Sequence, residues 1–108
     1  MAQKRPDNPA ADRMAVLGDP MRRAIFEMLA EGPRSVGEIA ENLPVTRPAV
    51  SQHLRALSEA GLVTHDSVGT RNLYRIEPER VAEVCDYLDR LWQKALANLK
   101  SRIEKPHQ

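Results

Sequence analysis

The sequence predicts a mainly α-helical domain that carries one small β-hairpin. Apolar residues recur at three- and four-residue steps, typical of helices, up to Gly61 and again after Pro78. Between these segments the chain is rich in strand-forming residues on both sides of the turn-forming stretch 67–70. A chain of 108 residues is long enough for one such domain with its own core.

Two Asx-Pro pairs, at residues 8–9 and 19–20, predict where the first two helices begin. The Asn or Asp side chain can cap free N–H groups of the first turn, and a proline there loses no helical hydrogen bond. The first helix then places Met14 and Leu17 on one apolar side. The second helix is expected over residues 21–31.

A third helix is predicted over residues 36–43 by a capping box, in which Ser35 and Glu38 satisfy each other's backbone N–H groups. The fourth helix should begin at the N-cap Thr46 and end at Gly61, which can adopt the left-handed conformation of a helix C-terminus. Two short helices joined by a tight turn form a helix-turn-helix arrangement.

The fourth helix has two different sides. One is apolar at helical spacing and must face a core, and the other carries hydrogen-bond donors and cations: Thr46, Arg47, Ser51, Gln52 and Arg55. In a DNA major groove Gln52 matches the edge of adenine, and Arg47 or Arg55 that of guanine. Thr46 and Ser51 suit phosphate or capping contacts better. A solvated helix surface is the alternative, and the neighbouring elements favour DNA.

The hairpin is predicted from residues 62–65 and 72–76. A hairpin directly behind such a helix is the wing of a winged helix-turn-helix domain. Arg71 lies near the tip of this wing, where it can meet a phosphate or a minor groove. The alternative is that Arg71 only solubilises the hairpin tip.

The last helix is expected from Pro78 to about Arg102, a length of about 36 Å. Its apolar band is broader than one small domain needs, and positions 81, 84, 88, 91 and 95 have the spacing of a helix-pair seam. We therefore expect a homodimer through the terminal helices. Its expected interface residues are Met14, Leu17, Val84, Leu88, Leu91, Trp92 and Leu99. Alternatively, the helix wraps only its own domain.

The expected organisation is a flexible arm over residues 1–8, a winged domain over 9–103 and a tail over 104–108. Within the domain, residues from about 78 to 103 form the dimerisation helix.

Charge distribution favours a nucleic-acid surface although the net charge is only +1. Residues 46–75 carry four arginines against two acidic residues, whereas residues 77–89 carry five acidic residues against one arginine. The single cysteine, Cys85, excludes an intramolecular disulfide and fits a reducing compartment. With no long apolar stretch or signal peptide, we expect a cytoplasmic protein that does not enter a membrane.

Cys85 and two of the histidines, His53 and His65, fall within the predicted elements. Cys85 is expected to be a small buried hydrophobe, and the alternative is a thiol that links two subunits and senses oxidants. His53 borders the apolar side of its helix and is expected to pack there, while His65 is expected on the wing surface.

Several motifs, in this order and spacing, resemble the ArsR-type family of winged-helix transcriptional repressors. They are residues 17–25, 35–43, 47–54 and 60–63, and then Gly69-Thr70-Arg71 with Tyr74. The resemblance implies a dimeric repressor that binds a palindromic operator in double-stranded DNA. It also implies that helices near both termini form the dimer interface.

The chain departs from the metal-sensing members of that family. The resemblance would place a Cys-x-Cys pair on the helix at 36–43, or an Asp-x-His pair with a later His-x-x-His or His-x-x-Glu pair on the last helix. The histidines here are His53, His65 and His107, too few and too scattered for the four ligands of a zinc site. We therefore expect no metal and no cofactor. A ligand-, redox- or metal-responsive sensor of the same family remains an alternative.

No enzyme is expected, because the sequence has neither a phosphate-binding glycine loop nor a recognisable nucleophile and base. The alternative outside the DNA-binding class is a winged-helix module that binds another protein.

Overall fold

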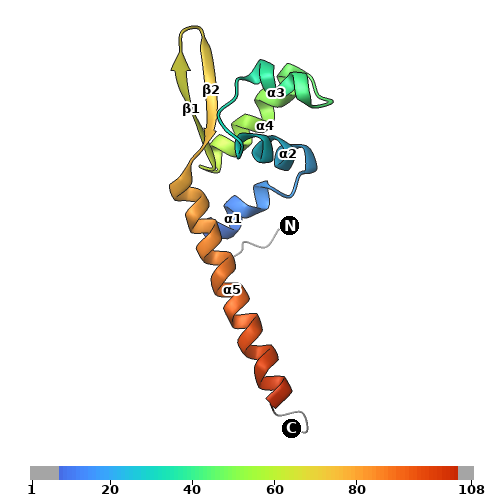
Figure 1. Ribbon diagram of the computed structural model, residues 1–108, viewed down its shortest axis with the longest axis vertical. Helices are drawn as coiled ribbons and strands as arrows, with labels where there is room; N and C mark the ends of the chain where they lie inside the picture. Colours follow the sequence, from blue (N-terminus) through green and yellow to red (C-terminus); the bar gives the residue numbers. More distant parts are fainter. Residues whose placement is uncertain (1–7, 105–108) are drawn as a thin grey trace, which may run out of the picture.

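The computed structural model describes residues 8–104 of the chain. Its elements are α1 (Pro9–Val16), α2 (Pro20–Leu29), α3 (Val36–Asn42), α4 (Arg47–Glu59), β1 (Val63–Val68), β2 (Arg71–Ile76) and α5 (Pro78–Glu104). Helices α2, α3 and α4 form a body with the hairpin beside it, and α5 runs away from this body (Figure 1). The predicted class, a mainly helical chain with a hairpin wing, is confirmed.

Residues 1–7 of the predicted arm lie outside the described residues, as do residues 105–108 of the tail with His107. Within the described part, α2 ends two residues earlier than expected and α5 continues to Glu104.

The first four predicted helix starts are capped as expected. The side chains of Asn8 and Asp19 accept hydrogen bonds from backbone N–H groups in the first turns of α1 and α2, at 3.1 and 2.9 Å. Ser35 and Glu38 form the complete capping box of α3. Thr46 accepts from the backbone N–H of Ala49 at 3.3 Å at the start of α4. Short-range sequence signals therefore determine where these helices begin.

The end of α4 also follows the sequence. Gly61 adopts φ +79°, the left-handed conformation expected of a glycine after a helix. Its N–H donates to the Ser58 carbonyl at 2.9 Å, and the N–H of Leu62 donates to the Leu57 carbonyl at 3.0 Å. This pair of bonds closes the helix and turns the chain toward β1.

The core consists of aliphatic side chains contributed by every element of the body. Its buried members are Ile25, Leu29, Ile39, Val50, Leu54, Leu57, Leu62, Val63 and Val84. Helix α4 supplies the apolar side predicted for it, and α2 and α3 both pack against this helix. Burial of that side fixes the orientation of the opposite, polar side of α4.

The wing is a longer hairpin than expected. Pairing runs from Val63 opposite Ile76 to Val68 opposite Arg71, which leaves a two-residue turn with Gly69 at φ +63°. The outer part of β1 is exposed, so no burial pattern marks it as a strand in the sequence. At its base the wing is attached to the body, because the N–H and carbonyl groups of Tyr74 pair with those of Arg34 at 2.8 and 3.0 Å.

Only the first turns of α5 pack against the core. Val84 is buried, whereas Cys85 is exposed, so the expectation of a buried cysteine was wrong for the subunit described here. Adjacent residues in a helix point about 100° apart, and the side of α5 that carries Val84 is the one that meets the core.

An arginine of α1 joins α1, α4 and α5. The Nε of Arg13 donates to the Ala60 carbonyl at the end of α4, and its Nη1 donates to Glu83 on α5, both at 3.1 Å. Arg13 is mostly covered, with 21% of its side chain exposed, so solvent screens these contacts less than it would at an open surface.

The core predicts a large difference between two truncations. Leu54→Ala should lower the free energy of unfolding by about 2–5 kcal/mol, because it leaves a cavity at a position with 0% exposure. Val68→Ala, at a position that is 55% exposed, should change it by less than about 0.5 kcal/mol. Denaturant unfolding at one fixed subunit concentration measures both, and equal losses would contradict the described core.

Candidate nucleic-acid interface

The polar side of α4 is exposed as the sequence predicted. Arg47, Ser51, Gln52 and Arg55 are all accessible, and so is the cap residue Thr46. Ser51, Gln52 and Arg55 point away from the buried stripe, and Arg47 occupies the first position of the helix. A continuous row of donors on one helix matches what a major groove can accept.

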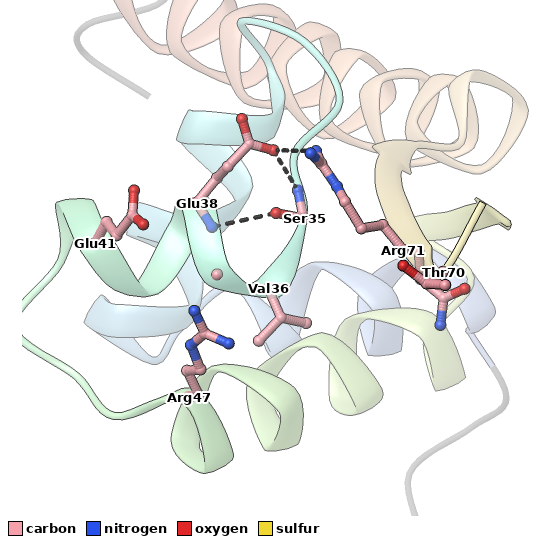
Figure 2. A pocket seen from close by; sticks show the side chains of 9 residues that line it. Ser35, Val36, Glu38, Glu41, Arg47, Thr70 and Arg71 are labelled. Atoms are coloured by element: carbon pink, nitrogen blue, oxygen red, sulfur yellow. Dashed lines mark hydrogen bonds and ion pairs between the residues drawn. The ribbon is translucent and has the colours of Figure 1, made fainter. Parts of the chain in front are cut away.

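Arg55 and Arg47 are placed differently within this row. Arg55 forms a helical ion pair with Glu59 at 3.4 Å, but 81% of its side chain is exposed, so this pair is weak and exchangeable. Arg47 folds back toward the start of α3 (Figure 2). A Cβ atom at Gly37 would lie 3.0 Å from the Arg47 Nη2, so a glycine there makes room for the guanidinium.

Arg71 reaches from the wing to the first turn of α3. Its Nη2 lies 3.1 Å from Glu38 Oε1, the same oxygen that accepts the Ser35 N–H at 2.9 Å (Figure 2). The contact joins residues 33 positions apart in the chain. The capping box identified Glu38 in the sequence, but a single sequence holds no signal for its pairing with Arg71.

These arginines border one surface hollow of about 430 Å³ between α3, the start of α4 and the turn of the wing. Its lining residues are Ser35, Val36, Gly37, Glu38, Glu41, Arg47, Thr70, Arg71 and Asn72. The hollow therefore brings together two basic residues that the sequence assigned to DNA, one from the helix and one from the wing. Thr70 and Asn72 were not among the residues expected to contact DNA.

The carboxyl group of Glu38 is held in its charged form. Hydrogen bonding by the Ser35 backbone and then by the Ser35 side chain lowers its pKa, and the positive charge of Arg71 contributes further. On the wing, Asp66 pairs with Arg75 at 2.9 Å and raises the pKa of that guanidinium. Arg75 is therefore already paired on the wing.

The two histidines of the described chain, His53 and His65, lie on different elements and in no shared cluster of metal-binding side chains. His53 is half-buried on α4, and His65 is exposed and packs against Tyr74 with ring centroids 4.9 Å apart and ring planes tilted by 44°. In the described part of the chain, no three His, Cys, Asp or Glu side chains converge as metal ligands would.

Among residues 8–104 no helix is both long and apolar enough to cross a bilayer.

The residues expected at a dimer interface fall into two groups. Leu88, Leu91, Trp92 and Leu99 are 45, 45, 62 and 54% exposed along α5, an unusual density of uncovered apolar side chains. By contrast Val84 is 6% exposed and belongs to the core, so it has little area left for a partner. Met14 and Leu17 are half-buried and pack against that core.

A polar helix surface flanked by a wing, with both held on a small helical core, defines a winged helix-turn-helix domain. Comparison with known proteins agrees with this geometry. A family described as "Helix-turn-helix domain" matches residues 17–66. The HTH-type transcriptional regulator Rv2034 of Mycobacterium tuberculosis is 49% identical over 88 residues, which cover 82% of each chain.

Two solved structures are similar over nearly the whole described chain. One is an ArsR-like transcriptional regulator from Rhodococcus sp. RHA1, with 32% identity, a TM-score of 0.73, and coverage of 86% of this chain and 91% of that one. The other is the homodimeric winged helix-turn-helix DNA-binding domain of Mb0332 from Mycobacterium bovis, with 31% identity, a TM-score of 0.61, and coverage of 86% and 92%. The chain belongs to the ArsR-type family of winged helix-turn-helix transcriptional regulators, and the resemblance inferred from its motifs is confirmed.

The lowered pKa of Glu38 predicts part of the acid dependence of stability. Its pKa is below the ordinary 4.5 in the folded chain, so its stabilising contribution is complete above about pH 4.5 and is lost as pH falls through the lowered value. Glu38→Gln keeps a capping acceptor but does not ionise, so its unfolding free energy should fall less steeply below pH 5. Thermal or denaturant unfolding from pH 3 to 7 measures the difference. Parallel curves for the two proteins would contradict the assigned cause.

Proposed function

We propose that the protein is a homodimeric repressor that binds a palindromic operator in double-stranded DNA. The observation that carries this proposal is the common placement of Arg47 and Arg71 at one hollow beside the exposed row on α4. In this arrangement α4 enters the major groove while the wing follows the adjacent backbone.

Within the major groove, Gln52 is the proposed base reader for adenine, and Arg55 for guanine. Arg55 leaves its exposed partner Glu59 at little cost. Each well-formed bidentate contact discriminates by about 1–3 kcal/mol against a wrong base. Thr46 and Ser51 lie where phosphate contacts fix the register of the helix rather than the sequence.

Outside the groove, Arg47 and Arg71 are proposed to contact phosphates. Arg47 lies back over Gly37 at the edge of the row, and Arg71 projects from the wing. Both are therefore better placed for the backbone than for base edges. Such contacts add affinity for DNA of any sequence and make it depend on salt.

The proposed dimer forms through α5, with α1 alongside. The exposed apolar side chains of α5 are only partly covered within the described subunit, and a second copy would bury them further. Leu88, Leu91, Trp92 and Leu99 are its proposed centre, with Met14 and Leu17 at its margin. The homodimeric state of the similar Mb0332 domain supports this assembly. We infer that residues 9–103 form the domain that binds DNA and dimerises, between the N-terminal arm and the C-terminal tail.

A two-fold symmetric dimer predicts the form of the operator. Selection from a random DNA pool should return an inverted repeat with half-sites about one helical turn, roughly 10 bp, apart. Leu91→Glu places a charge in the proposed seam and should sediment as a monomer that selects no fixed spacing. Val68→Glu, on the wing, is the matched control for oligomeric state and should remain a dimer. A selected site without symmetry, or a dimeric Leu91→Glu, would contradict the assembly.

Two substitutions separate base reading from phosphate contact. Gln52→Ala should relax base preference at one operator position by about 1–3 kcal/mol while leaving the dependence of binding on salt unchanged. Arg71→Ala should weaken binding to all sequences and reduce the slope of log K against log salt by about one. Polarisation titrations on operator and scrambled DNA at several salt concentrations measure both. If the unaltered protein binds these duplexes with an affinity that does not depend on salt concentration, the result would favour a protein partner instead.

A further inference from the structure

We propose that Glu38 competes with the DNA backbone for Arg71 and thereby limits the sequence-independent part of DNA affinity. The inference rests on the proposed function, because it concerns how the wing meets DNA. The proposed function itself gives Glu38 no part in DNA binding.

The contact between the two residues has the character of an exchangeable pair. Arg71 approaches Glu38 with one nitrogen, Nη2, at 3.1 Å, rather than with the two parallel bonds of a bidentate pair. The side chains are 59 and 46% exposed, so water can replace either partner. Pairs of this kind contribute little to stability, and a phosphate can displace them.

Glu38 itself is not free to follow Arg71. Its Oε1 accepts the Ser35 N–H at 2.9 Å, and its own N–H donates to the Ser35 Oγ at 3.2 Å. These bonds fix the carboxylate to the first turn of α3, whereas Arg71 is on an exposed hairpin. When the wing meets a phosphate, Arg71 must therefore turn away from Glu38.

The carboxylate also opposes the phosphate directly. Glu38 and Arg71 line the same hollow, so a phosphate bound by Arg71 would come within a few ångströms of a fixed negative charge. This distance is shorter than the screening length of about 8 Å at physiological salt. Both effects lower the affinity for DNA. Removal of the Glu38 charge would release Arg71 and remove the repulsion of the phosphate. The alternative is that Glu38 positions Arg71 for DNA. That role would require an ion pair that is stronger and less exposed than this one.

The test uses two matched substitutions in the full chain. Glu38→Gln removes the charge and retains an acceptor for the Ser35 N–H, since glutamine also serves in capping boxes. Glu41→Gln makes the same charge change on the same helix, at an exposed residue that lines the same hollow. Binding to a scrambled duplex and to the selected operator is measured at several salt concentrations.

Glu38→Gln should bind the scrambled duplex about two- to fivefold more tightly, the range that exposed ion pairs span. Glu41→Gln should change binding by less. In the Arg71→Ala background, the gain from Glu38→Gln should largely disappear, because the competition acts through Arg71. Glu38→Ala, compared at a temperature where it is folded, should show the same gain and provides a second variant.

The outcomes distinguish the inference from the proposed function. Unaltered protein that binds no duplex would overturn both. Salt-sensitive binding that Glu38→Gln leaves unchanged or weakens would overturn only the inference. An equal gain from Glu41→Gln, or an undiminished gain in the Arg71→Ala background, would also overturn it, since a general charge effect would then explain the result.

Discussion

Burial of one side of α4 is the constraint on which the remaining structure depends. Val50, Leu54 and Leu57 are fully covered by α2, α3 and the base of the wing, so the helix cannot rotate about its axis without exposing them. Loss of one such side chain costs a large share of the stability of a small domain. The same packing fixes the direction of the polar row. Orientation of the proposed reading surface is therefore a property of the core.

Most of the fold could be predicted from the sequence because its signals are local. Capping residues lie within three positions of the groups they satisfy, and the Gly61 conformation is required by the bonds that close α4. Apolar spacing shows which side of each helix is buried. These signals also predicted which residues of α4 are exposed. The hairpin was predicted in place but too short, because its outer residues face solvent and carry no burial pattern.

What the sequence could not predict depends on contacts between distant segments. Val84 and Cys85 are adjacent, small and apolar, yet one is buried and the other exposed, because only one side of α5 meets the core. The pair of Glu38 with Arg71 spans α3 and the wing and leaves no trace in spacing. In both cases the position of the neighbouring element decided the environment of the side chain. The DNA-contact and dimer residues remain predictions.

The two hydrogen bonds of Arg13 have a mechanical consequence. Its side chain donates to the carbonyl of Ala60, the residue that follows α4, and to the carboxylate of Glu83 on α5, while its backbone belongs to α1. A turn of α1 relative to α5 would strain the bond to Glu83, and a turn relative to α4 would strain the bond to Ala60. Arg13 therefore couples both terminal helices to the end of the helix that carries the polar row.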